Sequence, residues 1–403
     1  MDSIDSEGSE EMAASTQAPS YPLSLGQKAL WLLYKTAPEN VAYNLSGAVA
    51  VPADTNLDAL HRAFQRLAER HPMLRMLFTA SDGEPIQRVL PDADVDFRRE
   101  NASDLSPAQL NERLAAEIYR PFDVERRPAW RVAVFQHAPL DSAGGATSRG
   151  YPEHLVLLVI HHVLADLWSL AVIMSEIAAL YREEATGLPA ALKPLHTSYV
   201  DHIRKEAEML TGSQADASWE YWRAQLSGAL PPLDLPTDRP RPSLPTGSGA
   251  AHSIAIDHDL AERLRQLAKT CNVSLYTVLL TAFQTLLHRY TGQDDVLVGF
   301  PKAGRSHAFA RVVGYFVNPV VTRADFSENP RFADLLHTNQ RAIEESAAHD
   351  WYPFSQLVQR LRLPRELGRS PIFQAMFSWQ KTSALVPREQ AGSFTLGQGN
   401  DTV

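Results

Sequence analysis

Two adjacent histidines followed by an aspartate form the group of residues best suited to chemistry. His161 and His162 close the apolar run of residues 155–160, and Asp166 follows His162 by four positions. A side chain at the end of a buried strand is held rigidly and can face a cleft. The ordinary histidine pKa of about 6.5 suits proton transfer near neutral pH. The group predicts a histidine base or stabiliser, with Asp166 fixing an imidazole or holding the turn through an arginine.

The same residues allow two other interpretations. Both histidines could be ordinary hydrogen-bonded polar residues at a strand end, without chemistry. Two histidines and one aspartate could also bind zinc or iron. Neighbouring side chains on an extended strand point to opposite faces, however, which makes joint ligation awkward. We therefore expect no metal site.

Other catalytic signals are missing from the sequence. It contains no G-x-S-x-G turn, no P-loop and no dinucleotide-binding G-x-G-x-x-G. Cys271 is the only cysteine; it lies at the entry of an apolar helix without an evident basic partner and is expected to be structural. A candidate base without a nucleophile favours direct transfer between two bound substrates over a covalent intermediate.

Apolar periodicity predicts the elements that position these residues. A strand over 154–160 delivers the histidines, and a helix begins at Ser169. Similar mixtures of helices and strands before and after residue 250 indicate two related α/β subdomains. The full expectation is helices at 25–36, 57–70, 107–119, 169–185, 219–226, 259–269, 274–291, 330–348 and 354–361, and strands at 42–51, 73–78, 130–137, 154–160, 252–256, 296–299, 312–321 and 373–379.

Changes in composition predict the domain boundaries. Residues 1–20 contain five acids and no bases, and we expect a disordered tail rather than an export signal. Residues 21–190 form the first subdomain. Residues 191–250 form a crossing segment, because residues 229–250 hold six prolines that exclude helix and central strand. Residues 251–403 form the second subdomain, and residues 138–150 form a loop.

Composition excludes several classes of protein. A formal net charge of −9 argues against nucleic acid as the main ligand. The longest apolar run has six residues, and a membrane span needs about 20, so no membrane insertion is expected. A single cysteine excludes an internal disulfide, and we expect a cytoplasmic protein.

Several segments together resemble the condensation domains of nonribosomal peptide synthetases, of the chloramphenicol acetyltransferase-like superfamily. HHVLADLWS resembles the family's HHxxxDG motif. The other similar segments occur in the family's order and cover roughly residues 21–380: YPLSLGQKALWLLYKTAPENVAYN, RHPMLRMLF, RPFDVERRPAWRVAVF, YWRAQLSG with LPTDRPRP, GQDDVLVGFPKAGR, VGYFVNPVV, WYPFSQLVQRL and GRSPIFQAMF.

This resemblance implies an α/β fold in which two chloramphenicol acetyltransferase-like subdomains form a V-shaped pseudodimer with a central tunnel. Partner carrier proteins bring substrates on 4′-phosphopantetheine to opposite mouths, and no cofactor is bound. His162, beside His161, sits where the acceptor amine attacks and acts as a base or as an electrostatic stabiliser. Asp166 pairs with Arg75 in a structural role.

The sequence departs from the family at three points. Leu167 replaces the family's glycine after the aspartate, which puts the loop shape and the tunnel width in question. Trp168 and Ser169 still fit and, with Leu167 and Asn318, are expected to contact substrate. The chain stops before the family's usual last strands, so we expect an incomplete domain. No carrier domain precedes it, so the donor is expected to come from another protein or from acyl-CoA.

Amide formation is the favoured reaction. The retained histidine pair differs from heterocyclising relatives and from cytochrome-recruiting relatives that lose the second histidine; the glutamate motif of epimerising relatives and the DFGWG motif of plant-type acyltransferases are missing. We expect a starter domain that moves a fatty acyl group from acyl-CoA to an aminoacyl thioester, with Arg305 and Lys302 meeting the CoA phosphates. Its partners are downstream peptidyl carrier and adenylation domains. Alternatives are peptidyl or polyketidyl transfer from an upstream acyl carrier protein, and a noncatalytic recruitment platform.

Overall fold

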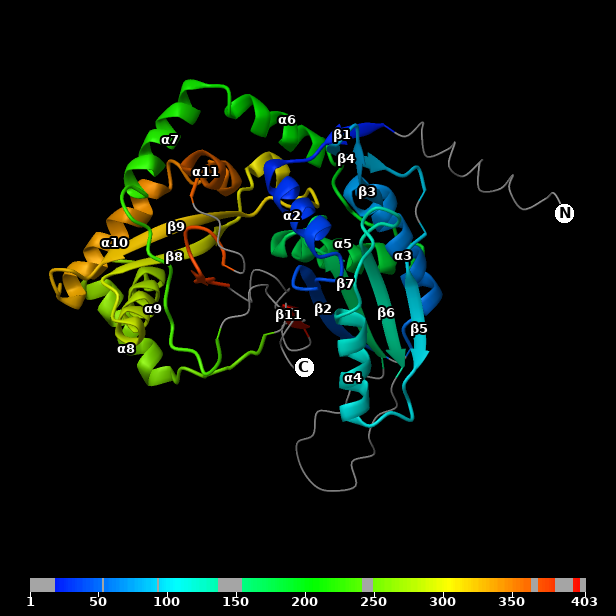
Figure 1. The fold of residues 1–403 in the computed structure, drawn as a ribbon. Helices are drawn as coiled ribbons and strands as arrows, with labels where there is room; N and C mark the ends of the chain where they lie inside the picture. The colour runs from blue at the N-terminus through cyan, green and yellow to red at the C-terminus, as the bar shows by residue number, and fades with distance from the viewer. Residues whose placement is uncertain are drawn as a thin grey trace, which may run out of the picture.

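A five-stranded sheet forms the centre of the first half of the protein (Figure 1). The computed structural model describes residues 19–52, 54–92, 94–136, 154–240, 249–363 and 369–380, and the backbone of residues 394–398. The strand order is β11-β2-β7-β6-β5, and only β5 and β6 pair in parallel. The strands are β2 (Asn44–Val51), β5 (Phe97–Asn101), β6 (Trp130–Gln136), β7 (His154–His161) and β11 (Phe394–Gln398).

Helices cover both faces of this sheet because its strands alternate two sets of buried side chains. Leu158 and Ile160 of β7 pack in one cluster with apolar residues of α3 (Leu57–Arg70) and α5 (Leu167–Thr186). Leu157 and Val159 pack on the other face in a cluster with α4 (Pro107–Ile118). The strand that ends in the histidine pair is therefore fixed from both sides.

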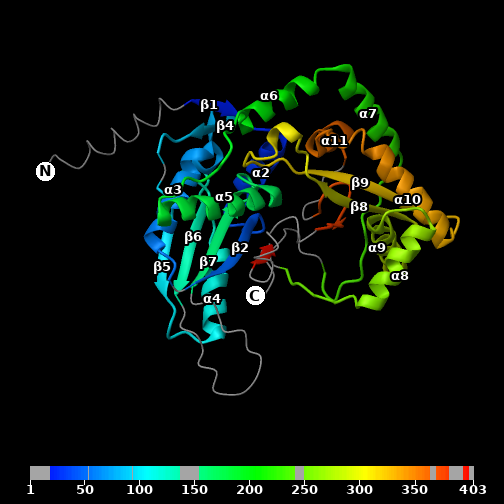
Figure 2. The same cartoon turned by 180° about the vertical axis from the view of Figure 1, so that it is seen from behind.

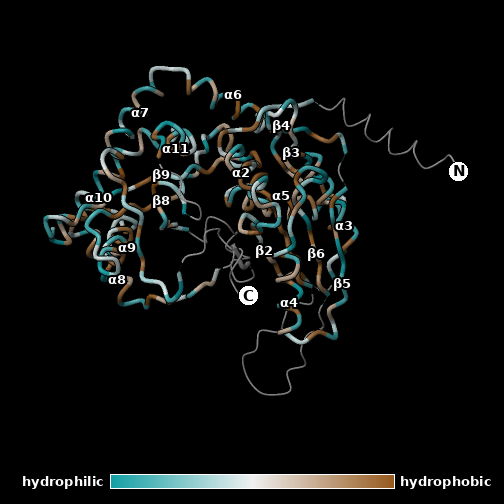
Figure 3. The backbone as a smooth tube through the Cα atoms, in the orientation of Figure 1, coloured by the Kyte–Doolittle hydropathy of each residue, from teal (hydrophilic) through white to brown (hydrophobic). Residues whose placement is uncertain are grey.

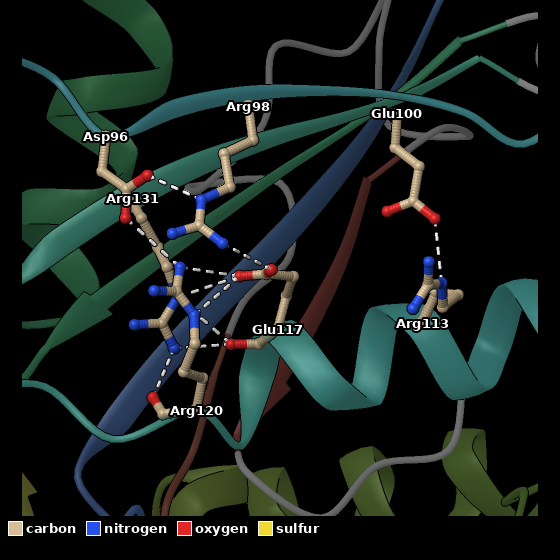
Figure 4. A network of polar contacts seen from close by, with 7 residues as sticks. All are labelled: Asp96, Arg98, Glu100, Arg113, Glu117, Arg120 and Arg131. Atoms are coloured by element: carbon tan, nitrogen blue, oxygen red, sulfur yellow. Dashed lines mark hydrogen bonds and ion pairs between the residues drawn. The ribbon is translucent and has the colours of Figure 1, made fainter.

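The C-terminal end of α4 is closed by the polar cluster drawn in Figure 4. The buried Arg131 guanidinium donates to the carbonyls of Glu117 and Arg120, and lies 3.4 Å from the Glu117 carboxylate. The Asn44 amide donates to the carbonyl of Ile118 at 2.8 Å. Burial lowers the pKa of Arg131 to about 10. This value is still well above neutral pH, so the guanidinium is charged. These two side chains satisfy helix carbonyls that would otherwise lack partners.

A small antiparallel sheet and a helix flank the first half. The sheet order is β1-β4-β3, and a 3-10 turn precedes β3. Helix α2 begins with a capping box in which Ser24 and Gln27 satisfy each other's backbone N–H groups. The bounds are β1 (Ser20–Pro22), β3 (Met76–Ser81), β4 (Glu84–Val89), η1 (Pro72–Arg75) and α2 (Leu25–Thr36).

The second half is built on a separate three-stranded sheet, in the order β10-β8-β9. Buried residues of α9 and α10 pack with Val296 and Val298 of β8. Hydrophobic and hydrophilic positions alternate along α10, as one buried face requires (Figure 3). The elements are β8 (Asp295–Lys302), β9 (Asn318–Asp325), β10 (Ala375–Met376), α8 (His258–Thr270), α9 (Leu275–Thr291), α10 (Phe332–Ser346), α11 (Phe354–Leu361) and η2 (His307–Phe309).

Two connections join the halves. Helices α6 (Tyr199–Met209) and α7 (Ser213–Gln225) run from one half to the other along one edge of the molecule (Figures 1 and 2). Near the other end of the chain, β11 pairs with β2 and so returns to the first sheet. The mixed α/β class is confirmed, and the fold has the two halves of a pseudodimer. The central tunnel and the domain boundaries stay predictions.

The sequence-based elements hold best where periodicity is strong. Residues 57–70 and 354–361 are helical as expected, and residues 226–240 contain neither helix nor strand. The strand predicted over 252–256 is wrong: no strand of the described chain lies beside it, and Ile254 is 80% exposed. The strand predicted over 312–321 begins only at Asn318, and that predicted over 73–78 begins only at Met76, because residues 73–75 belong to η1. Residues 1–18 and 137–153, which include most of the predicted tail and the loop over 138–150, lie outside the described residues.

Candidate active site

The histidine pair lies where β7 turns into α5. The backbone N–H of His161 donates to the Ala129 carbonyl, and that of His162 donates to the Tyr43 carbonyl, each at 2.8 Å. Asp166 then caps α5, because its carboxylate accepts from the N–H of Ser169 at 2.8 Å. The predicted order of strand, turn and helix is confirmed, and the helix begins at Leu167, two residues before the predicted start.

His162 has one nitrogen committed and one available. Its Nδ1 lies 2.7 Å from the Ala165 carbonyl, which can only accept, so Nδ1 carries the proton and donates. Nε2 is then the unprotonated nitrogen of the neutral ring. The imidazole is largely buried, and this burial lowers its pKa below 6.5. The residue still keeps some accessible surface. A neutral, reachable Nε2 is suited to accept a proton.

His161 continues the alternation of β7 toward α4 and away from His162. Its Nδ1 accepts from the N–H of Val163 at 3.1 Å, and its ring meets the Phe122 ring edge-on with centroids 6.4 Å apart. Burial lowers its pKa to about 3, so the ring is neutral. These contacts support the strand end; a catalytic role for His161 stays a prediction.

The predicted pair between Asp166 and Arg75 is wrong. Asp166 accepts a hydrogen bond from Nη2 of Arg305 at 2.8 Å, and the two side chains are 5% and 2% exposed. Arg75 lies at the end of η1 and donates to the backbone carbonyls of Ala68 and Pro91. The aspartate therefore joins the first half to the second, rather than to a neighbouring loop of its own half.

The same contact overturns the predicted CoA site. Arg305 is buried: its guanidinium also donates to Ser169 Oγ at 2.8 Å and stacks on the Phe316 ring at 3.9 Å. Burial at this depth leaves no path to a CoA phosphate. Lys302 is 43% exposed and forms an ion pair with Asp350 at 3.0 Å. The two residues thus do not form a joint cationic site at a mouth.

The remaining predicted substrate contacts fall into two groups. The Ser169 hydroxyl lies in the Asp166–Arg305 network, and the Asn318 amide donates to the carbonyls of Asp350 and Tyr352 and so holds the start of α11. Leu167 is half-buried against the first-half core. Trp168 is 49% exposed and donates from Nε1 to the Ala310 carbonyl at 2.9 Å. Substrate binding by these four residues stays a prediction.

The sequence-based site lacks one residue that the structure places beside His162. The Tyr315 ring stands edge-on to the imidazole, with centroids 5.1 Å apart and an interplanar angle of 87°. Tyr315 belongs to the segment VGYFVNPVV, whose pattern predicts a strand and which contributes to the family resemblance. Only the packing of the two halves brings position 315 to position 162.

The described residues contain neither a metal-binding cluster nor a single membrane-spanning helix. No group of three or more histidine, cysteine, aspartate or glutamate side chains there could hold a metal ion. Within the same residues no single helix is long and apolar enough to cross a membrane; only α8 and α9 together pass that test, with a bend of 105° between them.

Comparisons with known proteins agree on one family. The family model described as "Condensation domain" matches residues 17–400. A linear gramicidin synthase protein of Brevibacillus parabrevis is 36% identical over 364 residues, 89% of this chain and 7% of that protein. Phosphinothricin tripeptide synthetase PhsB of Streptomyces viridochromogenes is 34% identical over 388 residues, 94% of this chain and 32% of that protein. The chain thus spans at most about a third of these two curated relatives.

Solved structures agree on the fold. The X-domain from teicoplanin biosynthesis, in complex with OxyB, matches with a TM-score of 0.77 at 25% identity, over 89% of this chain and 77% of that one. A mutant starter condensation domain of rhizomide synthetase, in complex with C8-CoA, matches with a TM-score of 0.74 at 19% identity, over 91% of this chain and 80% of that one.

Proposed function

The chain belongs to the condensation-domain family of nonribosomal peptide synthetases, and we propose on this premise that it transfers an acyl group to the amine of a carrier-bound aminoacyl thioester. Condensation domains of these synthetases are amide-forming, acyltransferase-type enzymes. The observation that carries the proposal is the state of His162. Its Nδ1–H donates to the Ala165 carbonyl, burial favours the neutral ring, and the side chain keeps some accessible surface, so Nε2 can accept a proton.

The reaction needs only a weak base. An α-amine has a pKa of about 7.7 to 8.0, so roughly a tenth to a sixth of it is uncharged at pH 7. The amine nitrogen attacks the thioester carbonyl, a C–N bond forms, and the C–S bond breaks. Nε2 of His162 takes the proton that the amine loses and returns it to the leaving thiolate, or it stabilises the tetrahedral species electrostatically. Asp166 takes no part in this transfer, because its carboxylate is bound by Arg305 and Ser169.

For the donor we propose a fatty acyl group from acyl-CoA, which makes the chain a starter domain. The fold shared with the rhizomide starter domain, solved with C8-CoA, makes this donor worth testing. Transfer from an upstream carrier protein is the second candidate, supported by the 34% identity to a synthetase whose name specifies a tripeptide. The fold shared with the teicoplanin X-domain also suggests a recruitment platform, and the intact histidine pair counts against it.

Parallel reactions with two donors test the proposal. The protein is mixed with an aminoacyl-loaded peptidyl carrier protein and either octanoyl-CoA or the same acyl group on a carrier protein. Mass spectrometry of the acceptor carrier then measures the amide. We expect product from octanoyl-CoA. Product from the carrier-bound donor alone would replace the starter reaction by the second candidate, and no product from either donor would favour the platform.

The pH dependence follows from the lowered pKa of His162. Burial destabilises the charged imidazole, so the neutral, proton-accepting form persists below pH 6.5. Loss of the base on acidification should therefore occur below the ordinary histidine value. We expect kcat/KM to rise with pH through the amine pKa of roughly 7.7 to 8.0 and to show no inflection near pH 6.5. An inflection near pH 6.5 that is lost in His162→Ala would contradict this.

A further inference from the structure

The second half of the protein places a side chain against His162 that has no role in the proposed reaction. The Tyr315 ring meets the His162 ring edge-on at a centroid distance of 5.1 Å. Tyr315 comes from the segment between η2 and β9, whereas His162 directly follows β7 in the other half. A group that reaches His162 from the opposite half is placed to contact a substrate that binds next to the imidazole.

The peptide that carries Tyr315 is clamped on both sides by the first half. The N–H of Asp166 donates to the Gly314 carbonyl at 3.2 Å, and the Asp166 carboxylate accepts from the Phe316 N–H at 3.2 Å. The Ser169 hydroxyl donates to the same Gly314 carbonyl at 2.8 Å. These contacts give the motif aspartate a second task, which is to fix the backbone next to Tyr315.

The ring itself has little freedom. The Tyr199 hydroxyl donates to the Tyr315 carbonyl at 2.5 Å. On the α2 side, a Cβ atom at Gly26 would lie 2.6 Å from the Tyr315 ring, closer than real contacts allow. Only glycine at position 26 lets the ring occupy this place, so the aromatic side chain is pre-positioned against the imidazole rather than loosely packed.

The phenol hydroxyl is chemically available. Burial raises the pKa of Tyr315 above its ordinary value of 10, so the hydroxyl stays protonated at neutral pH. The side chain is only half-buried, and no described residue forms a hydrogen bond with its hydroxyl. A protonated phenol without a partner among the described residues, on a ring fixed against the His162 ring, is a ready hydrogen-bond donor.

We propose that Tyr315 donates a hydrogen bond to the acyl carbonyl oxygen of the substrate attacked beside His162. This proposal rests on the proposed amide-forming function and adds a second group to it. Negative charge grows on that oxygen as the amine adds, and a fixed neutral donor stabilises it without giving up its proton. His162 then handles the amine proton, and Tyr315 the carbonyl oxygen.

The test is the substitution Tyr315→Phe, which removes the hydroxyl and keeps the ring. Removal of one such donor lowers kcat by roughly 10²-fold in comparable sites, and we expect a loss of that order with KM and Tm unchanged. Tyr276→Phe is the matched control: the Tyr276 hydroxyl is buried without a partner among the described residues, but its ring packs against Phe300 and Phe377 in the second half. The control should keep the parent kcat.

Each other result overturns the inference. A Tyr315→Phe enzyme with the parent kcat would show that the hydroxyl is not used. A change in KM alone would make Tyr315 a ground-state binding residue, and a lowered Tm together with a lowered kcat would make it a packing residue. If the parent protein forms no amide from either donor, the proposed function itself fails, whereas an inactive His162→Ala beside a fully active Tyr315→Phe removes only the tyrosine.

Discussion

Substitution of His162 by alanine is expected to lower kcat for amide formation by about 10²- to 10³-fold while the protein stays folded. The two ring nitrogens have different roles. Nδ1 donates to the Ala165 carbonyl and holds the turn, and Nε2 is the nitrogen that can accept a proton from substrate. The measurement is amide formed per protein in single-turnover reactions, with thermal melts of each variant. A folded His162→Ala enzyme with parent activity would remove His162 from the mechanism.

Two further variants separate chemistry from folding. Asn in place of His162 can still donate an amide N–H toward the Ala165 carbonyl, but it offers nothing at the position of Nε2. We therefore expect His162→Asn to keep the parent Tm and to be as inactive as His162→Ala. His337→Ala, on the exposed face of α10, controls for loss of a histidine elsewhere and should match the parent.

Local chemistry explains which elements can be predicted from sequence. Ser106 as N-cap and Pro107 as first residue predict helix α4, and the structure shows both, with a capping box to Gln109. The strand β7 is predictable because it is apolar and ends in polar residues. By contrast, β5 reads FRREN, and β1 has only three residues; such short or charged edge strands form because a neighbour pairs with them, which leaves no periodic signal.

Non-local geometry explains what sequence reasoning misses in the site. The sequence indicates that Asp166 needs a cation, but it does not choose among the arginines, and Arg305 is 139 positions away. The nearer motif arginine, Arg75, is taken by carbonyls of its own half. The contact of Tyr315 with His162 cannot be predicted from sequence for the same reason. It depends on the hydrogen bonds by which Asp166 and Ser169 hold the segment that carries Tyr315.

Disruption of the Asp166–Arg305 pair is expected to lower the stability of the protein strongly. Both side chains are buried, so removal of either one leaves the other charge without its partner, and we expect Asp166→Ala and Arg305→Ala each to lower the free energy of unfolding by about 3 to 5 kcal/mol. Urea titrations of the single and double variants give the coupling energy. The double variant should be far less destabilised than the sum of the two, because the second substitution removes the charge that the first one leaves unpaired.

A second cycle, between Asp166 and Arg75, distinguishes this pairing from the one expected on sequence grounds. The two residues share no hydrogen-bond partner in the described structure, so their effects should add within about 0.5 kcal/mol. Strong coupling to Arg75 and none to Arg305 would contradict the observed geometry.

Asp166 variants that remain folded should also lose activity, since the carboxylate fixes the Phe316 N–H and through it the place of Tyr315 beside His162. Activity lost in parallel by Asp166→Ala and Arg305→Ala, but not by Arg75→Ala, would tie the junction between the halves to catalysis.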